Sequence, residues 1–360
     1  MAKKQEDRFV TLDNGEVAKA TFPIVVSASR STDIPAFYAD WFIHRLKKGY
    51  SAWTNPFNGV KSYVGYDDTK FIVFWSKNPR PLLNHLDYLK SRGIGCYIQY
   101  TLNDYEAEGL ERGVRPLAER IETFKLLVEK LGKGAVVWRF DPLILTDKID
   151  MDKLLSKIEE IGDQLIGYTE KLVFSFADIF SYRKVKSNLE RSHINYIDWT
   201  PEQMLEFAGR LVELNKQKGW NLILSTCGEA ANLPGVEHNH CVDDRLMVRF
   251  GSNSHELLKF LGAEIIDTAH FDNLFAEFEP VDIPEDAVDI GDGKYIAIRQ
   301  NNKDKGQRIA CGCMKSKDIG EYNTCPHLCE YCYANSSKEV AVRNWQQHKA
   351  NPLLDTITGK

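Results

Sequence analysis

The 360-residue sequence has little of what would place a protein in a membrane or on nucleic acid. No apolar run approaches the roughly 20 residues that a membrane-spanning helix needs, and the first 20 residues are polar, without the hydrophobic core of a secretion signal. The formal net charge is only −5, so no large excess of one sign attracts the whole chain to nucleic acid or to an anionic membrane. We therefore expect a cytoplasmic protein with no membrane contact.

Hydrophobic residues make up 43% of the chain and charged residues 27%, which is typical of a globular protein with one large domain or two modest ones. Apolar, β-branched runs alternate with helical segments along much of the chain. The seven predicted strands are residues 24–28, 51–56, 71–75, 96–102, 135–140, 172–177 and 221–226. The predicted helices are residues 37–46, 81–90, 116–131, 151–165 and 201–217.

Continuous apolar strands separated by helices predict an α/β fold with a parallel sheet that is covered on both faces. Seven or eight such units in some 250 residues favour a (β/α) TIM-like barrel over an open sheet. The eighth strand has two candidates, residues 246–250 and 295–299, so the barrel can be closed, partial or permuted.

The expected organisation divides the chain into four parts. They are an N-terminal extension (1–23), the barrel (24–250), an acidic insertion with its connector (251–300) and a C-terminal cysteine-rich segment (301–360). Ten acidic residues and no lysine or arginine lie between Leu261 and Asp292, whereas five basic residues lie between Lys294 and Arg308. Both stretches are compatible with a solvated surface, and the basic one is also compatible with an anionic ligand.

The cysteines carry the strongest functional signal. The chain has eight, and five of them lie between Cys311 and Cys332. Cys325, Cys329 and Cys332 have the spacing C-x3-C-x2-C. In a reducing cytoplasm such a triad favours zinc or an iron–sulfur cluster over disulfides. Structural zinc usually takes four protein ligands as two separated pairs, whereas three close thiolates suit three corners of a cubane and leave one iron without a protein ligand.

This motif, with Tyr331 immediately before the third cysteine, resembles that of the radical S-adenosylmethionine (SAM) enzymes, and the run from Cys325 to Ala334 resembles the cluster loop of spore photoproduct lyase relatives. The resemblance implies an oxygen-sensitive [4Fe–4S] cluster on the three cysteines. SAM would chelate the fourth iron and be cleaved reductively to a 5′-deoxyadenosyl radical, with an electron from a partner such as flavodoxin or ferredoxin. Tyr331, and Glu229 in a partial match to the family's Gly-Gly-Glu motif, are the candidate SAM-binding residues.

The position of the motif departs from the pattern of that family, in which it follows the first barrel strand near the N-terminus. A motif close to the C-terminus predicts either a permuted barrel or a C-terminal loop that folds back over the barrel mouth. Over residues 24–335 the chain is also similar to the family known as domain of unknown function 1848, through residues 26–35, 74–79 and 138–142 and the cysteine segment. That resemblance implies no substrate.

Four further cysteines form a second candidate site: Cys227, Cys241, Cys311 and Cys313. They can hold a second [4Fe–4S] cluster or structural zinc, with His238 or His240 as a replacement ligand, or they can be unrelated thiols. Cys96 lies inside an apolar strand and is expected to pack in the core.

Polar residues that follow strands would gather at the carboxyl end of a barrel, where such folds place their chemistry. These candidates are Arg30, Asp33, Asn55, Lys77, Asn78, Gln99, Arg139, Asp141, Ser175, Asp178 and Glu229. The cations Arg30, Lys77 and Arg139 suggest an anionic group such as the SAM carboxylate or a substrate phosphate. Asp33 and Asp141 lie at proline turns, which can hold a carboxylate toward a ribose or a substrate, although each can equally cap a turn or helix.

Three functions remain open on these residues. The first is a radical SAM enzyme that acts on a small molecule or another unidentified substrate. The second is an iron–sulfur protein for electron transfer or redox sensing that does not use SAM, and the third is a zinc-binding barrel hydrolase or nucleic-acid repair protein. The acidic balance and the lack of an aromatic-rich basic stripe disfavour nucleic acid as a substrate.

Overall fold

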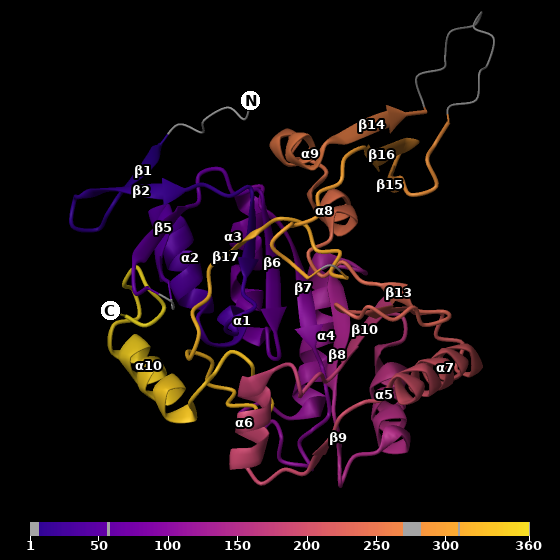
Figure 1. The fold of residues 1–360 in the computed structure, drawn as a ribbon. Coiled ribbons are helices and arrows are strands. Elements are labelled where there is room, and N and C mark those ends of the chain that lie inside the picture. Colours follow the sequence, from indigo (N-terminus) through magenta and orange to yellow (C-terminus); the bar gives the residue numbers. More distant parts are fainter. Residues whose placement is uncertain (1–6, 56–57, 269–281, 309, 360) are drawn as a thin grey trace, which may run out of the picture.

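The computed structural model describes residues 7–55, 58–268, 282–308 and 310–359 (Figure 1). An eight-stranded sheet with the order β13-β12-β10-β8-β7-β6-β3-β17 forms its centre, and all of its ladders are parallel. Its strands are β3 (Val25–Ala28), β6 (Phe71–Ser76), β7 (Gly95–Thr101), β8 (Val136–Leu143), β10 (Lys171–Phe176), β12 (Ile223–Thr226), β13 (Glu237–His238) and β17 (Lys317–Asp318). The predicted α/β class with a parallel sheet is confirmed.

Helices connect and cover these strands. They are α1 (Ile34–Phe37), α2 (Ala39–Lys48), the 3-10 helix η1 (Arg80–His85), α3 (Leu86–Ser91), α4 (Leu117–Leu131), α5 (Met151–Leu165), α6 (Arg183–Arg191), α7 (Pro201–Gln217), α8 (Asp244–Gly251), α9 (His255–Leu261) and α10 (Lys338–Ala350). Within the described residues, none of these helices has both the length and the apolar surface needed to cross a membrane.

Two hydrophobic clusters pack against the large sheet. The larger includes Val26, Phe74 and Trp138 from the strands together with apolar residues of α2, α4, α5 and α7. The smaller includes Val25, Val73 and other strand residues that alternate with the first set, packed against α8, α9 and the segment around Cys311 and Cys313. Successive side chains of a strand point to opposite faces, so the two clusters lie on opposite faces of the sheet.

The strand order follows the chain for six strands, since β3, β6, β7, β8, β10 and β12 are neighbours in succession. The C-terminal part then returns across the sheet (Figure 1), and β17 pairs with β3 through Lys317↔Val26 and Asp318↔Ser27. Consequently the loop that carries Cys325, Cys329 and Cys332, which follows β17, begins at the carboxyl end of β3. Almost 300 residues separate the two strands in the sequence.

The closed TIM-like barrel is not confirmed. Within the described ranges, no ladder joins β13 at one edge to β17 at the other, so the sheet is open there. The predicted eighth strand at residues 246–250 was wrong because these residues lie in α8. Asp243 caps that helix by accepting hydrogen bonds from the backbone N–H groups of Arg245 and Leu246, at 2.9 and 3.3 Å.

Two other predicted strands form but belong to smaller sheets. Residues 51–56 contribute to β4 (Tyr50–Thr54), which pairs with β5 (Lys61–Gly65) in a sheet completed by β1 (Arg8–Thr11) and β2 (Val17–Thr21). Residues 295–299 overlap β16 (Lys294–Ile298), which lies between β14 (Ala263–Asp267) and β15 (Val288–Gly291) in an antiparallel sheet. A two-stranded pair joins β9 (Leu145–Thr146) to β11 (Tyr196–Ile197).

The predicted outer segments also have structure. The N-terminal extension supplies β1 and β2, and β2 pairs with β5 from within the predicted barrel range. The predicted acidic insertion contains α9 and the sheet of β14, β15 and β16, and its residues 269–281 lie outside the described residues.

Glu108 provides a test of electrostatic stabilisation beside α5. Its carboxylate is buried, and lies 2.7 Å from Lys153 Nζ and 3.3 Å from Lys157 Nζ. Burial opposes its ionisation, but these two ammonium groups outweigh burial and lower its pKa. A lowered folded-state pKa stabilises the fold above the unfolded-state pKa, and this stabilisation is lost as the pH falls through the folded-state pKa.

Glu108→Gln is therefore expected to lower the free energy of unfolding at pH 7 by about 2 kcal/mol. The difference from the unsubstituted protein should shrink below about pH 4, where the glutamate itself becomes protonated. Urea unfolding between pH 3 and pH 7 measures both effects. Asp87→Asn, in the exposed pair with Lys130, is the control and should change stability by less than about 1 kcal/mol. A difference that does not depend on pH would contradict the ion-pair explanation.

Candidate functional site

The loop with Cys325, Cys329 and Cys332 is held against the carboxyl ends of the parallel strands. The Tyr38 hydroxyl donates to the Thr324 carbonyl at 2.6 Å, and the Glu330 N–H donates to the Leu110 carbonyl at 2.9 Å. Gly113 also lies directly against it, because a Cβ there would be 2.5 Å from the His327 carbonyl oxygen. Contacts from Tyr38 and from the loop of Leu110 and Gly113 thus fix the cysteine loop.

The three thiols of this loop are shielded from water. Cys329 is buried, and Cys325 and Cys332 are partly buried. Backbone N–H groups of Asp33 and His327 donate to Cys325 Sγ, and the Asn335 N–H donates to Cys332 Sγ at 3.3 Å. Burial raises the pKa of all three thiols. A bound cation would reverse this preference, since metal ligation deprotonates thiols.

Asp33 joins the loop to the sheet. Its Oδ1 accepts hydrogen bonds from the Ala36 N–H at 2.9 Å, as the cap of α1, and from Ser76 Oγ at 2.7 Å. Its Oδ2 accepts from the Lys77 N–H at 2.7 Å and lies 2.8 Å from His327 Nε2. The structure therefore uses this predicted catalytic residue to position the cysteine loop.

Tyr331 lies in a buried polar cluster that the sequence did not reveal. Its hydroxyl donates to Glu111 Oε1 and accepts from Lys77 Nζ at 2.9 Å and Asn103 Nδ2 at 3.2 Å. Lys77 Nζ is also 2.7 Å from Glu111 Oε1. Burial opposes ionisation of Glu111, but Lys77 and Arg120 outweigh it and lower its pKa to about 2.

Arg139 and Asp141 form a second ionic group. Arg139 Nη2 donates to Asp141 Oδ2, and Arg139 Nη1 donates to Gln99 Oε1 and to Cys241 Sγ, both at 3.1 Å. Asp141 Oδ1 also accepts from Ser175 Oγ. Burial disfavours the Arg139 charge, but the charges of Cys241 and Asp141 outweigh it and raise its pKa well above the ordinary value. Arg139 is 2% exposed.

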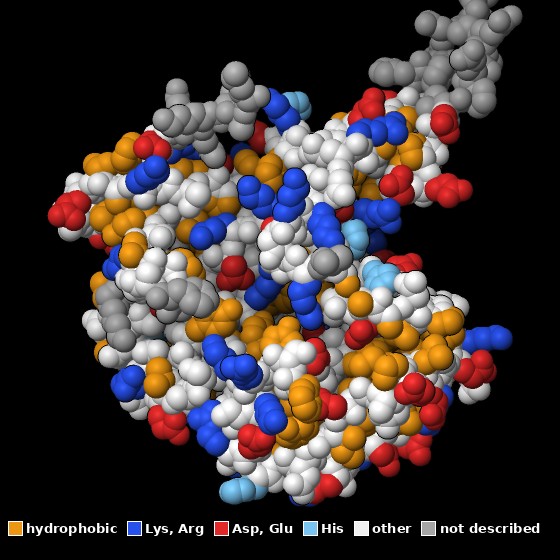
Figure 2. All heavy atoms as spheres, in the orientation of Figure 1, with side chains coloured by type: hydrophobic (Ala, Val, Ile, Leu, Met, Phe, Trp, Pro, Cys, Tyr) orange, Lys and Arg blue, Asp and Glu red, His pale blue; other side chains and the backbone are white. Residues whose placement is uncertain are grey.

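Arg30, like Arg139, lies over Trp75. The guanidinium carbons of Arg30 and Arg139 each lie 5.4 Å from the centre of a Trp75 ring. Arg30 Nη2 is buried and has no hydrogen-bond partner in the part of the chain that the structure describes. Figure 2 shows lysine and arginine side chains gathered around a hollow in the middle of this face, over the β6 and β7 region of Figure 1.

The four remaining candidate ligands also come together. Cys227 Sγ and Cys241 Sγ are 3.1 Å apart, and the Cys313 thiol is hydrogen-bonded to both Cys241 and Cys311. Hydrogen bonds with Cys227 and Cys313 lower the pKa of Cys241, and the hydrogen bond with Cys313 lowers the pKa of Cys311 to about 6. The structure thus brings these four cysteines together.

Other predicted residues have local roles. Glu229 follows the Cys227 turn, and its carboxylate accepts a hydrogen bond from the Ala230 N–H at 3.1 Å. His238 Nε2 is 2.9 Å from Asn232 Oδ1. The His240 ring lies against Gly312, so that a Cβ added to Gly312 would be 2.2 Å from the ring. Cys96 is buried in β7. Asp178 accepts from the Ser181 N–H at 3.1 Å, which is a turn contact.

The described side chains do not form a ready-made metal site. Within the described ranges, no three histidine, cysteine, aspartate or glutamate side chains have the geometry of one. The 3.1 Å between the Cys227 and Cys241 sulfurs is shorter than the roughly 3.8 Å expected around a tetrahedral zinc ion, so a metal would have to spread these sulfurs. The donor chemistry nevertheless fits, because both cysteine sets are shielded from water and receive N–H···S hydrogen bonds.

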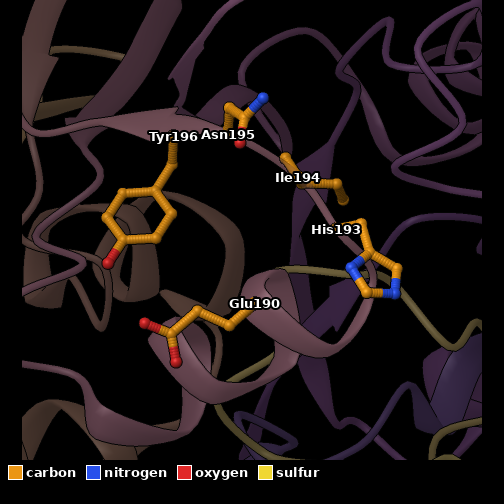
Figure 3. A pocket seen from close by; sticks show the side chains of 5 residues that line it. All are labelled: Glu190, His193, Ile194, Asn195 and Tyr196. Carbon is orange, nitrogen blue, oxygen red and sulfur yellow. The ribbon is translucent and has the colours of Figure 1, made fainter.

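A surface pocket of about 380 Å³ has no cysteine in its lining, although α6 beside it contacts the cysteine loop through Asn188, which donates to the Cys332 carbonyl at 2.8 Å. Figure 3 shows its lining residues on the end of α6 and the segment that follows: Glu190, His193, Ile194, Asn195 and Tyr196. None of the predicted site residues lines this pocket. The two cysteine sets are therefore the candidate functional site.

Comparison with known proteins gives one finding. A family model described as "Domain of unknown function (DUF1848)" matches residues 25–334, a range that contains every strand of the large sheet and all eight cysteines. No curated protein and no solved structure matches the chain.

Proposed function

Because the chain belongs to the DUF1848 family, whose description assigns no activity, we propose a function from the site itself. The chain is an iron–sulfur enzyme of the radical SAM type, with a [4Fe–4S] cluster on Cys325, Cys329 and Cys332. Its substrate carries an anionic group such as a carboxylate or phosphate.

The pairing of β17 with β3 carries this proposal. Strand β17 is an edge strand of the large sheet, next to β3, and the cysteine loop follows β17 in the chain. Counted from this edge, β17 is the first strand of the sheet. The triad therefore follows the first strand in spatial order, although it lies near the end of the sequence. This is the position that the radical SAM resemblance requires, and it supports a permuted and open (β/α) barrel.

The residues around the triad have roles that suit such a cluster. When bound, the cluster would supply the electron for reductive cleavage of SAM. Asp33 and His327 hold the loop that carries the ligands, and the backbone N–H groups of Asp33, His327 and Asn335 donate to ligand sulfurs. Tyr331 packs the loop onto Lys77 and Glu111 and helps to exclude water.

The cations define the class of substrate group. Arg139 has its charge balanced by Asp141, whereas Arg30 has a buried Nη2 with no partner among the described residues. A carboxylate or phosphate that accepts from Arg30 Nη2 would satisfy this donor. The SAM carboxylate and a substrate anion share this chemistry. The electron would come from flavodoxin or ferredoxin in the reducing cytoplasm.

The test is anaerobic purification of the full chain followed by addition of dithionite and SAM. We expect a brown protein that absorbs at about 400 nm, as thiolate-bound iron–sulfur clusters do, and that forms 5′-deoxyadenosine. Cys329→Ala/Cys332→Ala should abolish 5′-deoxyadenosine formation, whereas Cys96→Ala, which removes a buried thiol of β7, should retain it.

Two results would overturn the proposal. One is an intact, reducible cluster that leaves SAM unchanged, which would favour an electron-transfer or redox-sensing protein. The other is a colourless protein that contains zinc and no iron, which would favour the hydrolase or repair alternative.

A further inference from the structure

Cys227, Cys241, Cys311 and Cys313 lie on the face of the large sheet that α8 and α9 cover, away from the loop of Cys325, Cys329 and Cys332. Cys227 follows β12, Cys241 follows β13, and Cys311 and Cys313 belong to the segment that leads to β17. Three segments thus bring four thiols to one point. Cys241 is 1% exposed and Cys313 is 3% exposed, so these two thiols are buried and are not solvated surface groups.

The surroundings of these sulfurs are suited to negative charge. Cys241 Sγ accepts hydrogen bonds from Arg139 Nη1 and Asn239 Nδ2, both at 3.1 Å, and the Val242 N–H points at Cys313 Sγ at 3.4 Å. Arg139 pairs with Asp141 through one nitrogen, and its other nitrogen places positive charge beside the Cys241 sulfur. Thiolates on a cation are suited to such donors, because hydrogen bonds to the sulfurs stabilise and tune metal–thiolate centres.

We infer that Cys227, Cys241, Cys311 and Cys313 bind a second [4Fe–4S] cluster. The inference does not rest on the proposed SAM chemistry. Cys311 and Cys313 are separated by one residue, and the all-cysteine donor set also suits zinc, so the iron and zinc contents measured below distinguish the two metals. Gly312 permits this spacing, because the His240 ring occupies the space where any side chain would begin.

Full protein ligation distinguishes this cluster from the first. Four cysteines occupy all four irons, so no iron is open to substrate. Polar contacts connect the two cysteine sets. Arg139 contacts Cys241 and pairs with Asp141, and the Asp141 N–H donates to Asn103 Oδ1 at 2.9 Å. Asn103 in turn donates to the Tyr331 hydroxyl, beside Cys332. A continuous chain of polar contacts therefore runs between the two cysteine sets.

The test counts iron in the anaerobically purified, full-length protein. The unsubstituted chain and Cys96→Ala should contain about eight irons, and Cys227→Ala/Cys241→Ala and Cys329→Ala/Cys332→Ala should each contain about four. Only the second of these double variants should lose all SAM cleavage if the proposed function also holds. An eight-iron protein without SAM cleavage would overturn the proposed function and leave this inference intact.

A folding defect must be separated from a loss of ligands. Circular dichroism should give Cys227→Ala/Cys241→Ala the same helical signal as the unsubstituted protein, and Cys311→Ser, a nearly isosteric change, should lower only the iron that this site contributes. Three results would overturn the inference: about four irons in the unsubstituted protein that Cys227→Ala/Cys241→Ala retains, one zinc ion per chain that this variant loses, or a Cys227–Cys241 disulfide in peptide mass spectra of the anaerobic protein.

Discussion

Replacing Arg139 with methionine is expected to lower the free energy of unfolding by about 3 kcal/mol, the lower end of the cost of removing one partner from a buried ion pair, because the remaining Asp141 carboxylate is partly exposed. The guanidinium is 2% exposed and donates to Gln99, Cys241 and Asp141. Methionine fills much of the same volume but leaves the Asp141 carboxylate with Ser175 as its remaining side-chain donor in the part of the chain that the structure describes. Most of the lost stability therefore comes from the Asp141 carboxylate, which keeps its charge but loses its cationic partner.

Urea unfolding under anaerobic conditions measures this loss. Arg299→Met is the matched control, because Arg299 pairs with Glu264 on the surface and should contribute less than about 1 kcal/mol. Arg139→Lys should fall between the two, since an ammonium keeps the charge but cannot donate to three separate partners in the geometry of the guanidinium fork. Equal losses for Arg139→Met and Arg299→Met would show that the buried group does not stabilise the fold.

The parts of the fold that follow from local pattern were predictable. The runs that form β6, β7 and β10 are apolar over nearly their whole length, as expected for parallel strands buried on both faces. The position of Cys227 at a strand end was also predictable, whereas the strand β13 that precedes Cys241 was not predicted. Periodicity does not report which strands are neighbours, however, so the open edges of the sheet could not be predicted from it.

The parts that depend on long-range pairing were missed. Strand β17 is only Lys317 and Asp318, a charged pair with no apolar run, and it becomes a strand because β3 offers a free edge. Glu111 and Asn103 were missed for a related reason. Their side chains lie in loops, and only the folded position of Tyr331 shows that they share a site with Lys77. No spacing within the sequence gives this information.

The pair of Lys77 and Glu111 is expected to show strong energetic coupling. Lys77→Met leaves the Glu111 carboxylate, which is 1% exposed, with Arg120 as its remaining nearby cation, and should cost about 3 kcal/mol. Glu111→Leu leaves the Lys77 ammonium partly buried and should cost a similar amount. The double variant Lys77→Met/Glu111→Leu removes both charges and should be only about 1–2 kcal/mol less stable than the unsubstituted protein.

A double-mutant cycle from urea unfolding of the four proteins yields the coupling energy, and additive losses would exclude a direct interaction. The pair also anchors Tyr331, because Lys77 donates to its hydroxyl and Glu111 accepts from it. Among the described residues, the double variant retains only the Asn103 donor to that hydroxyl. Its stability should therefore recover, because an uncharged pocket can be well packed. Its rate of 5′-deoxyadenosine formation should stay low, because Tyr331, next to Cys332, is then poorly positioned. Recovery of both quantities would assign Lys77 and Glu111 to stability alone.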